Sequence, residues 1–304
     1  MSAVTVERET RATDLPPLRK KRRPFGLYVM GAFTIGMILY LASPVFLMIL
    51  YGFNNIQGER QVPKFTCCTL NWWKNILAVP ALNESLKTSI EVAVPAALIA
   101  TALGTLIGLV LGRYAFRGRG WINFVIFLAI AVPEIVLGSA LLSMFVKAND
   151  IGANITIGYT TILFSHIGFS IAFVAVTVRA RVSGLDRSLE NAAQDLFATP
   201  LQAFFRVTLP LILPGIVAGF LLAFVLSLDD FVITNFVQGQ TNTFPTWVYG
   251  ATRLGVPPQV NVWGTVLFSA GILAAAANLI VGSRSSRRAA RGVAVATVAR
   301  ERTS

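Results

Sequence analysis

The sequence is poor in charged residues and rich in apolar ones, which is unusual for a soluble protein. Asp, Glu, Lys and Arg make up 13% of its 304 residues, while hydrophobic residues make up 55%; soluble domains carry about 25% charged residues. The mean hydropathy is +0.66. A soluble core could not absorb apolar blocks of this length without leaving large apolar patches exposed. The composition therefore excludes an ordinary soluble protein and indicates an all-α integral membrane protein.

The sequence has few residues of the types that form catalytic, metal-binding or nucleotide-binding sites. The sequence has one histidine, His166, and two adjacent cysteines, Cys67 and Cys68, without the spacing of a metal site. Neighbouring cysteines bridge only through a strained ring, so we expect no redox role for them. No Gly-x-x-x-x-Gly-Lys-Ser/Thr phosphate loop is present, so the chain is not expected to bind ATP. No Ser/His/Asp set lies on one side of the bilayer, which argues against a membrane enzyme and predicts no catalytic residue, metal or cofactor in this chain.

Long uncharged runs predict six transmembrane helices. A helix needs about 20 mainly apolar residues to cross a bilayer, and the runs place helices at about 26–51, 86–112, 121–146, 159–178, 212–236 and 260–283. They form one transmembrane domain, residues 25–283, between basic tails at 1–24 and 284–304. The first tail has the charge of a signal-peptide start, but the apolar run behind it exceeds the usual length of about 7–15 residues. We therefore expect an uncleaved first span.

The basic residues predict the orientation. Of the 26 Lys and Arg residues, 20 lie in the two tails, the turn 113–120 and the stretch 179–211, all of which six helices place on one side. Because basic residues gather on the cytoplasmic side, we expect a multi-pass protein of the cytoplasmic (plasma or inner) membrane with both termini inside. The net charge of +12 then reflects orientation and attraction to membrane lipid, and no nucleic-acid partner is expected.

Small residues and a proline mark the second predicted helix. Gly104, Gly108 and Gly112 lie four residues apart, a pattern that lets helix backbones approach closely. We favour packing within the chain over a seam between subunits. Pro95 removes the donor that would pair with the carbonyl of Glu91, so we expect a kink there.

Four acidic residues fall within the predicted spans; Glu91, near the outer start of the second helix, is interpreted as interfacial, and the other three lie deeper. Glu134 follows Pro133, which should kink the third helix near mid-membrane, and Asp229 and Asp230 lie in the outer half of the fifth. Acidic groups without intramembrane Lys or Arg favour a cation pathway. Because successive helical residues point about 100° apart, we expect one aspartate to line the pathway and the other to make a structural bond. For His166 we favour a hydrogen-bonded packing role, with a proton relay as the alternative.

The stretch 183–211, between the fourth and fifth spans, is too long for a simple turn. Apolar residues recur there at helical spacing after Asp186, a suitable N-cap. A second short helix should begin at Thr199 with a capping box and end before Pro210. Two short helices at an angle could enter a groove on another protein or pack against the chain's own spans.

The same stretch resembles the coupling motif of membrane subunits of type I ABC importers. The motif reads roughly Glu-Ala-Ala, three residues, Gly, nine residues, an aliphatic residue, one residue and Leu-Pro. Phe197 occupies the position of the usual Gly, where a bulky residue is costly, so we expect a rebuilt turn. The residues that the resemblance assigns to coupling with an ATPase are Glu190, Ala192, Ala193, Asp195, Phe197, Ala198, Pro200, Leu209 and Pro210.

Four more segments resemble the second permease subunit of spermidine/putrescine importers, namely 133–138, 163–166, 227–234 and 255–261. This resemblance implies the six-helix, MetI-like permease fold of type I ABC importers and half of a polyamine pathway lined by Glu134, Asp229 and Asp230. It implies a heterodimer with a second permease subunit, two ATP-binding subunits that hold ATP and Mg, and an extracytoplasmic binding protein. Importers of thiamine, ferric iron, phosphonate or sulfate share the motif and stay open. A proton-coupled secondary transporter is a less favoured alternative.

Overall fold

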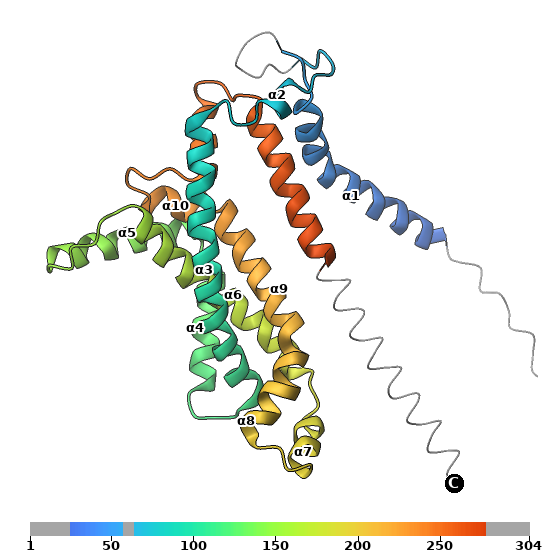
Figure 1. The fold of residues 1–304 in the computed structure, drawn as a ribbon, viewed down its shortest axis with the longest axis vertical. Helices are drawn as coiled ribbons and strands as arrows, with labels where there is room; N and C mark the ends of the chain where they lie inside the picture. The colour runs from blue at the N-terminus through green and yellow to red at the C-terminus, as the bar shows by residue number, and fades with distance from the viewer. Residues whose placement is uncertain (1–24, 57–63, 278–304) are drawn as a thin grey trace, which may run out of the picture. The chain divides into compact units, whose positions relative to one another are not determined.

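The computed structural model describes residues 25–56 and 64–277, which are largely helical (Figure 1). In chain order the helices are α1 (Phe25–Tyr51), α2 (Asn71–Lys74), α3 (Pro80–Arg113), α4 (Arg119–Ala131), α5 (Glu134–Asp150), α6 (Tyr159–Ser183), α7 (Ser188–Asp195), α8 (Pro200–Ala203), η1 (Phe204–Thr208), α9 (Leu209–Asp229), α10 (Val232–Val237) and α11 (Phe244–Thr252). A last helix, Gln259–Ala277, carries no label.

The predicted all-helical membrane fold is confirmed. Within the described residues, five helical segments are long and apolar enough to cross a bilayer, and six spans result if the bent pair α4 and α5 counts as one. The two predicted tails and the end of the sixth span lie outside the described residues. Helix α3 begins earlier and α6 ends later than the sequence predicts.

The chain divides into a unit that ends at Leu47 and a unit that begins at Met48. The first contains most of α1, whose bounds agree with the prediction. The Thr and Ser side chains of α1 bond to its own backbone: the Thr34 hydroxyl donates to the Met30 carbonyl at 2.8 Å, and the Ser43 hydroxyl donates to the Tyr40 carbonyl at 2.7 Å. These bonds let hydroxyl groups enter an apolar environment.

Helices α3, α6 and α9 form the centre of the second unit, where they lie side by side (Figure 1). Small residues and valines bring them together: the buried core contains Ala97, Val174, Val178, Ile212 and Ala223. Helix α3 has 34 residues, about 51 Å at 1.5 Å per residue, so it exceeds the hydrocarbon thickness of about 30 Å. It is the long element against which α6, α9 and α11 pack.

The three spaced glycines lie on the face of α3 that meets α6. A Cβ atom at Gly104 would lie 2.7 Å from the Val174 side chain, and one at Gly112 would lie 2.6 Å from Val182. Packing within the chain, which we favoured over a subunit seam, is what the structure shows. No larger side chain fits unless the helices separate.

Replacing Gly108 with Ala should lower the free energy of unfolding by about 1–3 kcal/mol, because the added methyl overpacks a helix seam. Its Cβ atom would lie 2.8 Å from the Ala175 carbonyl oxygen and 3.1 Å from the Arg179 nitrogen, and backbone cannot rotate away. Gly168→Ala is the matched control, since nothing lies within 4 Å of that position. Thermal melting in detergent checks this; equal melting temperatures for the two variants would contradict it.

Pro95 lies inside α3, which continues through it. The carbonyl of Glu91, freed as predicted by the missing proline N–H, accepts the Tyr159 hydroxyl at 3.0 Å. A side chain of α6 thus satisfies the backbone group that the proline leaves unpaired.

The third span is not one kinked helix, as predicted, but two helices. Helices α4 and α5 meet at an angle of 106°. Val132, which precedes Pro133, is extended (φ −65°, ψ 129°), as residues before proline tend to be. The prediction of a continuous helix 121–146 is wrong, and Glu134 is the first residue of α5.

The fifth predicted helix, 212–236, is broken as well. Helix α9 ends at Asp229, Asp230 is extended, and α10 starts at Val232. The Asp230 carboxylate accepts the backbone N–H of Thr234 at 2.8 Å, so it satisfies a donor that the start of α10 leaves free. This local bond explains why the apolar run changes direction without a proline.

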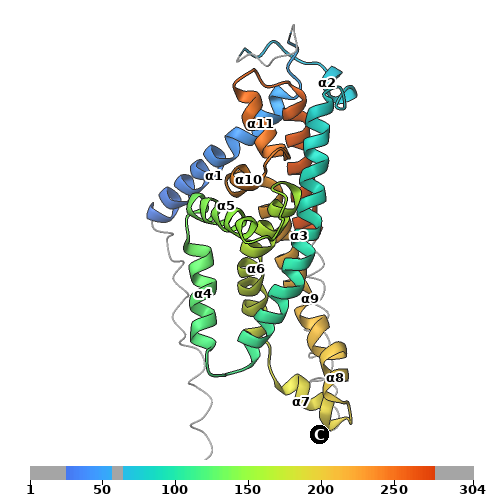
Figure 2. The same ribbon diagram turned by 90° about the vertical axis from the view of Figure 1, so that its left-hand side faces the viewer.

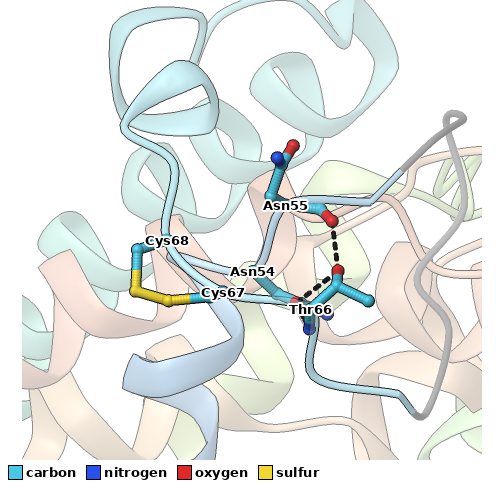
Figure 3. Close-up of a disulfide and its surroundings, with 5 residues drawn as sticks. All are labelled: Asn54, Asn55, Thr66, Cys67 and Cys68. Atoms are coloured by element: carbon cyan, nitrogen blue, oxygen red, sulfur yellow. Dashed lines mark hydrogen bonds between the residues drawn. A yellow bond between two sulfur atoms is a disulfide. The ribbon is translucent and has the colours of Figure 1, made fainter.

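The loop before α2 is organised around the buried side chain of Asn54 (Figure 3). Its amide donates to the Lys64 carbonyl at 2.9 Å and accepts the Thr66 N–H at 2.7 Å. Beside it, Cys67 and Cys68 are joined in a disulfide, although a bridge between neighbouring cysteines closes a strained ring.

Candidate functional site

The two broken spans and α6 line a cavity of about 300 Å³ in the second unit. In Figure 2, α5 and α10 lie at the same level beside α6. The cavity is lined by Ala129, Ile130, Val132, Glu134, Leu137, Phe169, Phe173, Leu226, Asp229, Asp230, Phe231, Val232 and Ile233. It therefore combines three carboxyl groups with apolar and aromatic walls, and none of these described lining residues is Lys or Arg.

The two adjacent aspartates have different surroundings. Asp230 is buried, and its Oδ2 accepts the backbone N–H and the hydroxyl of Thr234, each at 2.8 Å. Asp229, the last residue of α9, is exposed, as is Glu134 at the start of α5. The arrangement leaves Asp229 and Glu134 available to a ligand, whereas Asp230 is engaged in holding α10.

His166 is fully buried and bonded to protein groups at both nitrogens. Nδ1 lies 2.7 Å from the Ser227 hydroxyl, and Nε2 lies 2.9 Å from the Thr234 hydroxyl. Nε2 also lies 3.3 Å from Asp230 Oδ2. Because the Thr234 hydroxyl donates its hydrogen to Asp230, Nε2 must be the donor to Thr234.

This hydrogen-bond network joins α6 to both sides of the break between α9 and α10. His166 does not line the cavity, so the structure places it in the packing role that we favoured. Sequence reasoning did not single out Ser227 and Thr234, because only the fold brings them to His166.

At the opposite end of this unit from α2 and α11, α7 and α8 project beyond the spans (Figure 2). Helix α7 follows Asp186, whose carboxylate accepts the Ser188 N–H at 2.9 Å. Hydrogen bonds from the backbone and side chain of Ser188 lower the pKa of Asp186. A charged carboxylate at this position favours the start of a helix.

The predicted second short helix does not end before Pro210. The capping box is present, since Thr199 and Gln202 bond reciprocally at 3.3 and 3.1 Å, but the chain continues through the π-helical η1 into α9. The Leu209 N–H bonds to the Phe204 carbonyl, five residues back. Pro210 has no N–H to offer, and a wider turn accommodates it. The two short helices α7 and α8 are present as predicted, but the predicted end of the second helix before Pro210 is wrong, because α8 continues into the fifth span.

Glu190, predicted to couple to a partner, bonds within the chain. Its Oε1 accepts Arg113 Nη2 at 2.5 Å and also the Thr208 hydroxyl. Arg187 donates to the carbonyl of Arg113. Glu190 therefore ties α7 to the end of α3 and to η1. No residue near Glu190 in the sequence indicates this contact with Arg113, which lies 77 positions away.

Phe197 closes α7 in the left-handed conformation, with φ 63°. The Phe197 N–H bonds to the Gln194 carbonyl at 2.9 Å, and the Ala198 N–H bonds to the Ala193 carbonyl at 3.1 Å. These are the two bonds of a Schellman motif, which usually has glycine at this position. The expected rebuilding of the turn is wrong: the turn is kept, at a cost of about 1–2 kcal/mol for a residue with a side chain.

The predicted coupling residues fall into two groups by exposure. Ala192, Asp195, Phe197, Pro200 and Pro210 are exposed, whereas Glu190, Ala193, Ala198 and Leu209 are half-buried. The exposed residues are available to a partner. The half-buried residues hold the exposed ones in place. Within the described residues, no cluster of three or more His, Cys, Asp or Glu side chains is placed to hold a metal ion.

A family match and two similar proteins all indicate a membrane subunit of a transport system. Residues 104–293 match the family described as "Binding-protein-dependent transport system inner membrane component". The chain is 37% identical to the putrescine transport system permease protein PotI of Escherichia coli strain K12 over 76% of this chain and 82% of that protein. It is 32% identical to the spermidine/putrescine transport system permease protein PotC of the same strain, over 84% and 94%.

Solved structures show the same fold at low sequence identity. A chain of a bacterial ABC transporter that imports the acidic polysaccharide alginate is 16% identical, with a TM-score of 0.63, over 86% of this chain and 95% of that one. A chain of the MetNI methionine ABC transporter in an inward-facing conformation is 16% identical, with a TM-score of 0.52, over 69% and 96%.

Proposed function

Because the chain belongs to the family of inner membrane components of binding-protein-dependent transport systems, we propose that it forms half of a polyamine import pathway. It is a membrane subunit of an ABC importer, a transport component and not an enzyme. Relatives named for putrescine and spermidine transport support the substrate class. Both termini, with the tails 1–24 and 284–304, lie in the cytoplasm in this proposal, as the basic residues predict.

The observation that carries the substrate class is the chemistry of the cavity. Glu134 and Asp229 supply exposed carboxylates for ammonium groups, and Phe169, Phe173 and Phe231 supply faces for methylene chains and cations. A polyamine consists of ammonium groups separated by methylene chains. The cavity thus offers a counterpart to each part of such a molecule.

The same chemistry disfavours the alternative solutes. Phosphonate and sulfate are anions, and carboxylates in the cavity wall would repel them. Ferric iron requires several oxygen ligands converging on one point, and the described residues contain no such group. Thiamine, a cation, remains the second candidate.

The energy source in this proposal is a partner. Two ATP-binding subunits carry ATP and Mg, a second permease subunit completes the pathway, and an extracytoplasmic binding protein delivers substrate. Closure of the ATP-binding pair moves α7, and the motion passes to α3 through Arg113 and Glu190 and to α9 through η1.

Uptake of radiolabelled putrescine and spermidine into proteoliposomes tests the proposal. The chain is purified with its second permease subunit, ATP-binding subunit and binding protein. We expect uptake only when ATP and Mg are supplied on the side of the membrane that the ATP-binding subunits face. Unlabelled spermidine should compete with the labelled substrate for uptake, and sulfate should not. Uptake by this chain alone under a pH gradient would establish the secondary-transporter alternative. Inhibition of uptake by thiamine, and not by polyamines, would show that thiamine is the substrate.

A further inference from the structure

A second cavity lies at the end of the second unit that carries α2 and α11, opposite α7 and α8 (Figure 2). Its volume is about 790 Å³, and ligand pockets usually have about 300–1,000 Å³. The polar and aromatic residues that line it are Trp72, Asn75, Asn242, Thr246, Trp247 and Gln259. We call it the tryptophan cavity, and the one that contains Glu134 and Asp229 the carboxylate cavity. None of the described residues that line the tryptophan cavity is Asp, Glu, Lys or Arg, so its wall is uncharged.

Gln259 is the residue of this cavity that indicates a ligand. It is 5% exposed and lines the cavity, and its side chain has no hydrogen-bond partner among the described residues. Buried polar groups are hydrogen-bonded in nearly all native structures, so this amide requires a partner that enters the cavity. Gln259 belongs to the segment 255–261, to which the carboxylate cavity gives no role.

Hydrogen bonds outside the tryptophan cavity hold its two aromatic walls. The indole N–H of Trp72 donates to the Asn54 carbonyl at 2.8 Å, which fixes the ring against the loop before α2. On the other side, the N–H of Phe244 at the start of α11 donates to the Ser89 hydroxyl of α3 at 2.7 Å. This bond positions the helix that carries Trp247. Because the walls are held in advance, a ligand would bind with little cost for ordering them.

We propose that the tryptophan cavity is a second polyamine site, in which the Gln259 amide oxygen and the indole rings of Trp72 and Trp247 hold an ammonium group. An ammonium group has hydrogen-bond donors and no acceptor, so an amide oxygen is a suitable partner. It is also attracted to the face of an indole ring. This inference rests on the proposed function, because it takes a polyamine as the substrate. It extends that function by adding a site that contains no carboxylate.

The two cavities lie at different levels along α3. Pro80, the first residue of α3, lines the tryptophan cavity. Val92 packs in one cluster with Ile233, which lines the carboxylate cavity. About 12 residues separate Pro80 from Val92, which is about 18 Å at 1.5 Å per residue. In the proposed orientation the uncharged site is the outer one, and its weaker attraction lets the substrate leave for the carboxylates, since conduction requires release as well as binding.

The uncharged wall restricts what else could occupy the cavity. An anion would lack a basic partner among the described lining residues, and a purely apolar molecule would leave the Gln259 amide unpaired. The ethanolamine headgroup of a lipid shares the ammonium chemistry of a polyamine. The experiment therefore has to distinguish these two sources of an ammonium group.

Equilibrium binding of radiolabelled spermidine tests the second site. The sample is the purified complex of both permease subunits and the ATP-binding subunits in detergent, and Asp229→Asn is present throughout to weaken the carboxylate cavity. We expect Gln259→Glu to tighten binding about tenfold, because it adds a charge near the ammonium group, and Gln259→Leu to weaken it. A merely structural role would make both changes harmful. Trp247→Ala should weaken binding about fivefold, and Trp121→Ala, at a 69% exposed position on α4, is the matched control.

The outcomes separate the second site from the proposed function. Wild-type affinity in both Gln259→Leu and Trp247→Ala, in a complex that imports polyamine, would overturn the site and leave the proposed function intact. If the unaltered complex neither binds nor imports polyamine, both fail. Displacement of spermidine by an equal concentration of glycerophosphoethanolamine would assign the cavity to a lipid headgroup. If the variants bind spermidine normally but lose stimulation of ATP hydrolysis by the binding protein, the cavity receives that protein, and the proposal is overturned.

Discussion

Replacing Asp229 with Asn is expected to lower ATP-driven polyamine uptake at least about tenfold while assembly stays intact. The exposed carboxylate at the end of α9 lies in the cavity wall, and the amide has the same shape without the charge. A carboxylate about 4 Å from an ammonium group interacts by roughly 4 kcal/mol at an effective dielectric constant near 20. Loss of about 1.4 kcal/mol of this attraction already gives a tenfold effect.

Uptake rates at several substrate concentrations, together with co-purification of the other subunits, check this expectation. Ser139→Ala is a suitable control, because that hydroxyl is exposed on α5 and bonds to its own helix. Wild-type uptake in Asp229→Asn would remove this residue from the pathway.

The neighbouring change, Asp230→Asn, should act on stability instead. The carboxylate offers two acceptor oxygens to the backbone N–H and the hydroxyl of Thr234 and to the Ile233 N–H, and an amide offers one. A buried donor left unpaired costs about 1–3 kcal/mol, so we expect a lower melting temperature and less folded protein. An Asp230→Asn protein that melts like the wild type but fails to transport would instead assign Asp230 to the pathway.

The spans, and a structural bond for one of the two aspartates, could be anticipated from sequence, but the breaks could not. No proline or glycine lies in 220–236 to mark a break near Asp230, and only the bonds between Asp230 and Thr234 show that the helix ends there. At Pro133 the sequence predicted a kink. It did not reveal that α5 would turn by 106° and pack against α10, where a Cβ on Gly138 would meet the Phe236 ring at 2.7 Å.

Phe197 and Glu190 show a second limit of prediction from the sequence. The sequence indicated the cost of a bulky residue at the glycine position, but not that two backbone hydrogen bonds would hold the turn unchanged. It assigned Glu190 to a contact with a partner, because a motif gives the position of a residue in the sequence but not the direction in which its side chain points. The guanidinium that Glu190 meets belongs to a distant helix, and such pairs carry no local signal.

Breaking the pair between Arg113 and Glu190 is expected to separate ATP hydrolysis from transport. In Glu190→Gln, α7 keeps the exposed residues that a partner can contact, but its charged bond to α3 is lost. We expect ATP hydrolysis to persist while polyamine uptake falls about tenfold, so that less substrate moves per ATP consumed.

A double-mutant cycle identifies the pair as the cause. The Arg113 and Glu190 side chains are 11% and 28% exposed, so removing either leaves a poorly hydrated partner unpaired, at a cost of about 1.5–3 kcal/mol for a hydrogen bond to a charged group. Arg113→Ala, Glu190→Ala and the double variant should therefore have similar melting temperatures and similar losses of uptake, because the second change removes nothing further. Arg119→Ala, at the start of α4, serves as the basic-residue control. Additive losses in the double variant would show that the two residues act separately, and α7 would then act on the spans through η1 alone.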